Sequence, residues 1–485
     1  MASLISHSVA TMGDPNVKSD GKTPTSIELT KSVKDWWNCS RNLKRPTSGL
    51  SNAKFVEARN RLVQLEYNLF RAILSSDVSI VPPGEAEPDN GVKEITARFV
   101  DTTLEEDSSV YIHEFEITNK TDLSLPKRDI VIIHGYMAAL GYFIKNFEAL
   151  AKSYGNLTIH AIDMPGFGNS ARPRFPPDLL KTPKNATQAQ QVSQVLGAEA
   201  WFIDKFEGWR KVRNLEHFDL VAHSMGAYLG SCYIMKYNCQ GSSPIIKNFV
   251  VVSPMGTESS SVSLINHKSH QRNFHEDGGD PLEEIFANMP VDESHTPELQ
   301  RLWEKLGEPK FPKNKILQTM WEWSVSPFQI LQIFGPVYSK VLSYWSFQRF
   351  KNLKSNSEAS DGPVSVDLIN KLHEYSYSVF NQYQGSGELA ITKLINHNIL
   401  ARLPLCDRGF LELINKIGMR TLWLYGDKDW MNMQGGKYCV EKLKALGHED
   451  AELTIVKDAG HHLYLDNPDE FNEIVTDFLQ LEKDS

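Results

Sequence analysis

The feature that most constrains the fold is an alternation of short apolar runs and longer helical stretches beyond residue 127. The apolar runs occupy residues 130–133, 157–162, 218–222, 249–252, 421–425 and 453–456. This alternation is typical of β-α-β units, in which parallel strands form a sheet and helices cover its faces. The sequence therefore predicts an α/β fold.

A long interruption separates the fourth run from the fifth. It covers about 165 residues, far more than an ordinary connection. It contains a polar loop at residues 257–279, a Trp- and Phe-rich helical stretch at residues 302–350 and a Ser/Asp linker at residues 355–362. We expect a helical cap at residues 257–415, inserted between two parts of one core at residues 95–256 and 416–485.

The N-terminal region has a different pattern. Residues 1–30 are polar and lack periodicity, so we expect a disordered tail there. Residues 31–94 are expected to form an amphipathic lead-in helical region, because apolar residues recur at three- and four-residue spacing. The alternating segments at residues 95–100 and 110–117 predict an antiparallel pair that opens the sheet.

Composition excludes several classes of protein. The 485 residues carry a net charge of -9 with 41% hydrophobic residues, which is unlike collagen-like or disordered chains and argues against general nucleic-acid binding. The 5 cysteines are scattered and show no zinc-site spacing, so no metal or redox cofactor is predicted. The most apolar stretch, at residues 324–345, is interrupted by Gln, Gly, Pro and Lys, so we expect it to lie on a membrane without crossing it.

The segment LVAHSMG at residues 220–226 places a serine between a predicted strand and a predicted helix. In a nucleophile elbow the chain turns sharply from strand to helix and exposes the serine Oγ, which requires small flanking residues. The usual pattern has glycine two positions before the serine, where this chain has Ala222. We predict that Ser224 is a nucleophile; the alternative is a serine that only caps a helix.

A nucleophilic serine needs a histidine base and an acid that orients the base. His461 and His462 follow the last predicted strand, and Asp427 and Asp429 follow the strand before it. We predict His461 as the base, with His462 packed or facing solvent. We predict Asp429 as the acid, with Asp427 in a solvated turn as the alternative.

Backbone amides that face the reacting carbonyl oxygen stabilise its negative charge in such enzymes. The elbow supplies the amide of Met225, and the loop after the first parallel strand supplies that of Tyr136 or Met137. Gly135 allows the backbone to approach a substrate closely. His134 is predicted to be a structural loop residue.

Five segments together resemble the α/β-hydrolase superfamily: HGYMAALGYF, DMPGFGNS, AHSMGAYL, YGDKDWMN and AGHHLYLDNPDEF. The chain is most similar to the branch of fungal cardiolipin-specific deacylases, soluble lysophosphatidic acid acyltransferases and the lipid-droplet lipase coactivator. The cap segment GSGELAITKLINHNILARLPLCDR also resembles this branch, so the likeness spans residues 36–481. It implies a mostly parallel eight-stranded sheet with a helical cap.

Members of this branch act on glycerophospholipids, or bind lipid droplets where the nucleophile has been lost. Because Ser224 is present, the resemblance implies a serine hydrolase that deacylates a membrane phospholipid such as cardiolipin. The same site is compatible with acyl-CoA-dependent acylation of lysophosphatidic acid, with acyl-CoA as co-substrate. A non-catalytic lipid-surface scaffold and a hydrolase of small soluble esters are further alternatives. The implied location is intracellular and membrane-associated, either mitochondrial or at the cytoplasm and lipid droplets.

The branch also carries a His-x4-Asp pattern linked to acyl transfer, which here joins His461 to Asp466. However, residues 467–470, NPDE, are typical of a helix start with Asn as N-cap and Pro at the first position. We favour the interpretation that Asp466 only lies beside a capped helix.

Aromatic residues with a basic edge mark the cap and are typical of a surface that sits in lipid headgroups, although each aromatic is equally compatible with a core position. Trp36 and Trp37 are candidates for a second anchor. The cap aromatics are Trp303, Trp321, Trp323, Phe328, Phe334, Tyr344, Trp345 and Phe347, and the basic residues are Arg349, Lys351 and Lys354.

Overall fold

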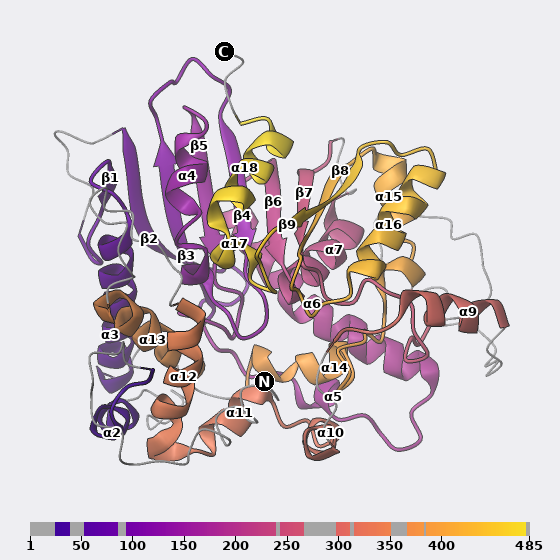
Figure 1. Ribbon diagram of the computed structural model, residues 1–485, viewed down its shortest axis with the longest axis horizontal. Coiled ribbons are helices and arrows are strands. Elements are labelled where there is room, and N and C mark those ends of the chain that lie inside the picture. The colour runs from indigo at the N-terminus through magenta and orange to yellow at the C-terminus, as the bar shows by residue number, and fades with distance from the viewer. Residues whose placement is uncertain are drawn as a thin grey trace.

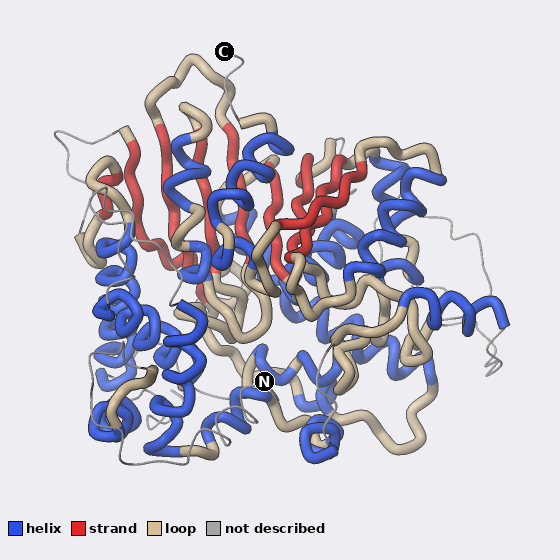
Figure 2. The backbone as a smooth tube through the Cα atoms, viewed as in Figure 1, coloured by secondary structure: helices blue, strands red, loops and turns tan. Residues whose placement is uncertain are grey.

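A mostly parallel sheet forms the centre of the protein (Figures 1 and 2). The computed structural model describes residues 25–38, 53–85, 94–238, 243–265, 297–310, 315–350, 366–382 and 385–481. Within these residues the sheet has nine strands in the order β1-β2-β3-β5-β4-β6-β7-β8-β9. The strands from β5 to β9 run parallel to one another, which confirms the predicted α/β class.

The strands coincide with the predicted apolar runs, with one addition. They are β1 (Val78–Ile80), β2 (Ile95–Thr103), β3 (Tyr111–Asn119), β4 (Arg128–Ile133), β5 (Leu157–Ile162), β6 (Phe218–His223), β7 (Ile246–Val252), β8 (Arg420–Gly426) and β9 (Ala451–Val456). As predicted, β2 pairs antiparallel with β3. The short β1 pairs parallel with β2 and brings the number of described strands to nine instead of the expected eight.

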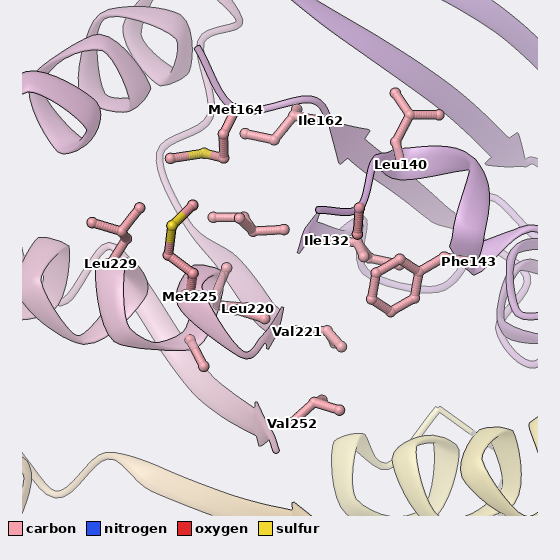
Figure 3. Packing of buried hydrophobic residues seen from close by; sticks show 14 of the residues in the cluster. Ile132, Leu140, Phe143, Ile162, Met164, Leu220, Val221, Met225, Leu229 and Val252 are labelled. Atoms are coloured by element: carbon pink, nitrogen blue, oxygen red, sulfur yellow. The ribbon is translucent and has the colours of Figure 1, made fainter. Parts of the chain in front are cut away.

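The central strands are apolar because both of their faces are covered. Every residue of β5 and β6 is buried, as expected for parallel strands between layers of helices. Ile132, Leu220, Met225 and Val252 belong to one packed cluster of buried hydrophobic residues (Figure 3). The strand ends are therefore held rigidly where the functional loops begin.

Two groups of helices accompany the sheet. In Figure 1, α4 and α18 lie in front of it, and they contact each other. The helices α6, α7, α15 and α16 form a second group in which neighbours are in contact. The bounds are η3 (Leu140–Phe143), α4 (Phe147–Lys152), α5 (Pro177–Leu180), α6 (Gln188–Val212), α7 (Met225–Tyr237), α15 (Phe410–Ile417), α16 (Met433–Ala445), α17 (Leu463–Asp466) and α18 (Pro468–Leu479).

Between β7 and β8 the chain forms the helices that were expected as a cap, and α10 to α13 lie below the sheet in Figure 1. The polar segment at residues 257–260, expected as a loop, is buried, and the helix α15 crosses the expected boundary at residue 415 to pack against α7 and α16. Residues 266–296 and 355–362 lie outside the described residues. The remaining helices are α9 (Pro297–Leu306), α10 (Lys315–Glu322), α11 (Pro327–Gln332), η4 (Gly335–Val337), α12 (Tyr338–Phe350), α13 (Val366–Phe380), η5 (Gly387–Leu389), α14 (Ile391–Leu394) and η6 (Leu405–Asp407).

The N-terminal region forms the helices α2 (Leu29–Trp37) and α3 (Ala53–Ile73). The expected tail at residues 1–30 is wrong in its last part, because Ile27 is buried and its N–H donates to Ser343 Oγ at 3.0 Å. The reason is tertiary: α2 packs against η4 and α12 of the cap. Residues 1–24 lie outside the described residues.

Candidate active site

The turn between β6 and α7 holds Ser224 in a strained backbone conformation. Its φ is 55° and its ψ is -116°, a combination that non-glycine residues avoid. Two hydrogen bonds fix the turn: Ser224 N–H donates to Val252 O at 2.9 Å, and Met255 N–H donates to Ser224 O at 3.2 Å. The conformation is that of the predicted nucleophile elbow.

Two glycines make this turn possible. A Cβ on Gly226 would lie 2.5 Å from His134 O, and a Cβ on Gly135 would lie 2.9 Å from Ser224 Cβ. A side chain at Gly226 would therefore clash with backbone, and one at Gly135 would clash with Ser224 and with the His223 ring. Ala222, the departure from the usual pattern, is a buried residue of β6 whose methyl group is accommodated there.

The structure brings the three predicted catalytic side chains together. His461 Nε2 lies 3.1 Å from Ser224 Oγ, and His461 Nδ1 lies 3.2 Å from Asp429 Oδ1. Burial would raise the pKa of Asp429, but His461 beside it and hydrogen bonds from His461 and Ser253 lower it, so Asp429 stays ionised. The alternative acid, Asp427, is exposed and accepts a hydrogen bond from Ala459 N at 2.9 Å, away from His461.

Ser253, which was not predicted as a site residue, follows β7 directly. Its Oγ donates to Asp429 Oδ2 at 2.5 Å and lies 2.8 Å from His461 Nδ1, closer than Asp429 does. Its φ is 43°. The signal in the sequence was a small polar residue directly after the apolar run at residues 249–252, at the edge of the sheet where Ser224 also lies.

The neighbouring histidines are held by hydrogen bonds and burial. His134 Nε2 accepts Met164 N–H at 3.0 Å, and His134 Nδ1 lies 2.7 Å from Gly135 O, in agreement with the predicted loop role. His462 lines the cavity, and its Nδ1 lies 2.9 Å from Tyr464 OH. Burial lowers the pKa of both His134 and His462, so both rings are neutral.

The residues predicted to supply oxyanion amides lie around Ser224. Met225 is the first residue of α7, and Tyr136 and Met137 line the same cavity as Ser224. Within the described part of the chain, the amides of Tyr136 and Met137 have no hydrogen-bond acceptor. Tyr136 OH donates to Glu388 O at 2.9 Å and thereby ties this loop to η5.

A cavity of about 420 Å³ opens above Ser224 between the strand-end loops and the cap helices. Its wall is mainly apolar, with Trp321, Leu331 and Trp345 from the cap and Trp430 from the loop after β8. Of the other cap aromatics, Phe328 and Phe347 are buried and Trp323 and Phe334 are exposed. The cavity suits an acyl chain with its ester at Ser224.

Asp466 occupies a defined place beside the catalytic loop. Its Oδ2 accepts Gly460 N–H at 2.9 Å, and its carboxylate pairs with Arg349 of α12. The predicted helix start is also present, because Asn467 Oδ1 accepts Glu470 N–H at 3.5 Å. Asp466 thus contacts both the histidine loop and the cap. Lys351 and Lys354 lie outside the described residues.

Two buried clusters have the composition of metal sites: Glu66, His113 and Asp163, and Glu114, Glu116 and His160. In each cluster both histidine nitrogens already face carboxylates. Despite burial, these carboxylates raise the pKa of His113 to about 10 and that of His160 to about 9. A protonated imidazole has no lone pair for a metal, so both clusters fit ion-pair networks better than metal centres.

Comparisons with known proteins identify a family and several similar proteins. The profile described as "Alpha/beta hydrolase family" matches residues 130–474. The chain is 27% identical over 346 residues to "Probable 1-acylglycerol-3-phosphate O-acyltransferase" of Oryza sativa subsp. japonica, covering 71% of this chain and 66%, just under two thirds, of that protein. It is 24% identical over 346 residues to "(Lyso)-N-acylphosphatidylethanolamine lipase" of Homo sapiens, covering 71% and 77%. The crystal structure of bromoperoxidase from Bacillus anthracis is 14% identical with a TM-score of 0.44, covering 79% of this chain and 99% of that chain.

Proposed function

Because the chain belongs to the α/β-hydrolase family, we propose that it is a serine hydrolase that removes an acyl chain from membrane glycerophospholipids. The observation that carries the proposal is the row of contacts from Ser224 through His461 to Asp429, at the end of a cavity of about 420 Å³. Relatives whose names specify glycerophospholipid substrates support the lipid class.

The mechanism follows from the geometry. Ser224 Oγ attacks the acyl carbonyl carbon while His461 Nε2 takes the serine proton, and Asp429 stabilises the imidazolium that forms. The amides of Met225 and of Tyr136 or Met137 stabilise the oxyanion. When the intermediate collapses, the lysolipid leaves with the proton from His461. Water then attacks the acyl-serine, which releases a fatty acid and restores Ser224.

Ser253 is a positioning residue in this scheme. Its hydroxyl accepts from His461 Nδ1–H and donates to Asp429, so it holds the ring and the carboxylate in register. This arrangement fixes the tautomer in which His461 Nε2 is free to accept the proton of Ser224.

The exposed apolar side chains near the cap support contact with a lipid surface. Leu29, Val33 and Trp37 recur at four-residue spacing on α2 and are 50%, 44% and 75% exposed. Ile333 and Phe334, next to η4, are also exposed, and η4 contacts α2. An apolar stripe of this kind enters the headgroup region of a bilayer. In the described part of the chain, no helix combines the length and apolar character of a membrane span.

The direct test is mass spectrometry of the products from purified protein with vesicles of cardiolipin, phosphatidylcholine and lysophosphatidic acid. We expect lysolipid and free fatty acid from the wild type and neither from Ser224→Ala. Ser243→Ala is the matched control, because Ser243 is exposed and precedes β7 at the opposite end from Ser253. Equal product from wild type and Ser224→Ala overturns the proposal. Absence of Ser224-dependent fluorophosphonate labelling in the wild type supports the scaffold alternative.

Acyl transfer is the second candidate, because several relatives are named 1-acylglycerol-3-phosphate O-acyltransferase. An acyl-serine can be released by the hydroxyl of lysophosphatidic acid as well as by water. Adding oleoyl-CoA to the same vesicles separates the two reactions. Phosphatidic acid that appears only with oleoyl-CoA and only with Ser224 intact would make transfer the main activity.

The choice of cardiolipin and of mitochondria rests on the family resemblance alone. Neither word occurs in the names of the relatives described above. Comparing rates on cardiolipin and phosphatidylcholine in the vesicle experiment tests the first, and microscopy of the tagged full-length chain in cells tests the second.

A further inference from the structure

The charged side chains that line the catalytic cavity are cationic. Among the described lining residues, Arg349 and Lys428 carry formal charge and none is a carboxylate. Most of the other lining side chains are apolar. Such surroundings strengthen electrostatic interactions with a group that enters the cavity.

Arg349 is held in place but keeps unused donors. Its Nη1 lies 2.8 Å from Asp466 Oδ1, whereas its Nη2 reaches His462 O only at 3.4 Å. Its Nε is buried and has no acceptor within the described residues. A guanidinium offers five donors in a fixed plane, so this one can bind a further acceptor without leaving Asp466.

Both cations contact the loop that carries His461 or its immediate partners. Asp466 joins Arg349 to Gly460 N–H, one residue before His461. Lys428 N–H donates to Ala459 O at 2.9 Å, and Lys428 Nζ lies 2.7 Å from Asp458 Oδ1. The Lys428 side chain is 63% exposed, and its partner Asp458 is 85% exposed, so this ion pair costs little to open.

We propose that Arg349, assisted by Lys428, forms a subsite for the phosphate of a glycerolipid whose acyl ester lies at Ser224. The inference rests on the proposed function and adds the group that selects the substrate. In a glycerophospholipid, ester and phosphate are attached to the same three-carbon glycerol, so a phosphate beside the histidine loop leaves the ester within reach of Ser224. The planar guanidinium matches phosphate oxygens in pairs, and the apolar wall receives the acyl chain.

The test measures binding, so it does not depend on turnover. In a Ser224→Ala background, isothermal titration calorimetry compares 1-oleoyl-lysophosphatidic acid with 1-oleoylglycerol, which lacks only the phosphate. The variant is Arg349→Gln combined with Asp466→Asn, because Arg349→Gln alone would leave Asp466 without its counter-charge. We expect the Kd for the phosphate ligand to rise at least about tenfold, with a change below about threefold for oleoylglycerol. Arg349→Lys should give an intermediate Kd.

A second ligand distinguishes the source of the phosphate. In oleoyl-CoA the phosphates are far from the thioester, so its Kd should not depend on Arg349. If the Kd for lysophosphatidic acid is unchanged in the double variant, or if only oleoyl-CoA binding weakens, the subsite assignment is wrong. Thermal unfolding of each variant checks that it is folded. Failure of the hydrolase proposal is distinguished by two other results. The wild type would then show no fluorophosphonate labelling of Ser224 and would release no fatty acid.

Discussion

Two groups of buried histidines in this protein carry opposite charge states. At the strand ends around Ser224, burial lowers the pKa of His223 well below its usual range, and the ring is neutral. On β3, His113 is equally enclosed, yet its pKa is raised to about 10 because Glu66 and Asp101 contact its two nitrogens. Burial alone does not set the charge of a histidine; the carboxylates within hydrogen-bond distance do.

The difference matches the task of each region. Asp429 is the one carboxylate that contacts His461 among the described residues. The neutral rings of His223 and His462 lie beside the His461 ring, with centroids 4.6 and 5.4 Å away in tilted and edge-on arrangements. His461 therefore has a carboxylate only on its Nδ1 side, and its Nε2 faces Ser224. His113 has carboxylates at both nitrogens, and the contact with Glu66 joins α3 to the sheet.

The largest expected effect is the loss of activity when Asp429, the carboxylate beside His461, is replaced. Asp429→Asn should lower kcat on the order of 10⁴-fold, because the amide no longer stabilises the imidazolium. Steady-state hydrolysis of a short-chain ester measures the change. The control is Asp427→Asn, which removes an exposed carboxylate bound only to the backbone around Ala459 and should stay within about threefold. A larger loss in Asp427→Asn would reverse the choice of acid.

The second effect is on the stability of the charged region. Glu66 accepts hydrogen bonds from His113, Asn169 and Tyr375 at 2.7, 2.9 and 3.0 Å. Glu66→Gln removes one partner of a buried ion pair and should lower the free energy of unfolding by about 3–5 kcal/mol. Urea unfolding measures it, with the exposed Glu57→Gln on the same helix as a control below about 0.5 kcal/mol. Equal losses of unfolding free energy in Glu66→Gln and Glu57→Gln would contradict the ion-pair network around Glu66.

Ser253→Ala tests the hydroxyl that lies between base and acid. Removing it deprives His461 Nδ1 of its nearer contact at 2.8 Å, while Asp429 remains at 3.2 Å. We expect kcat to fall about 10- to 100-fold, or about 1.4–2.7 kcal/mol, with little change in KM.

A rescue experiment separates positioning from packing. Ser253→Asp in the Asp429→Asn background places a carboxylate where the hydroxyl lies 2.8 Å from His461 Nδ1, in a positive-φ conformation that Asp tolerates. Activity should recover at least about tenfold over Asp429→Asn alone. A purely structural Ser253 predicts no recovery.

The smallest expected effect is the change in the free energy of unfolding per pH unit. The folded-state pKa of His113 is raised to about 10 from an ordinary value of 6.5, so its contribution is complete below about 6.5 and is lost as the pH rises toward 10. The unfolding free energy should therefore fall across this window by at most about 1.4 kcal/mol per pH unit. Comparing wild type with His113→Gln by urea unfolding from pH 6 to 10 tests this, because their difference should shrink as the pH rises.

The sequence predicted the parallel strands from short apolar runs, which burial on both faces leaves, and it predicted β2 and β3 from alternating apolar residues. It missed β1, whose three residues carry no periodic signal. Ser224, His461 and Asp429 were predictable because each follows a strand end in a characteristic local pattern. Ser253 and Glu66 were not, since a serine or a glutamate is ordinary in sequence and its contacts come from segments far along the chain.

The position of Arg349 was only partly predictable. The basic edge of the aromatic stretch suggested a surface role, whereas its side chain lines the cavity and pairs with Asp466, 117 residues further along the chain. A helical pattern predicts on which side of the helix a residue lies. The residue that it contacts there depends on how the cap packs against the core.

The hydrogen bond from Tyr136 OH to Glu388 O links two segments that are far apart in the sequence. One end of this bond belongs to the loop after β4, which lines the cavity, and the other to η5 in the segment between β7 and β8. A displacement of η5 would therefore also move the loop that we propose to supply an oxyanion amide, so in the proposed hydrolase the position of the cap and the stabilisation of the reacting carbonyl are linked.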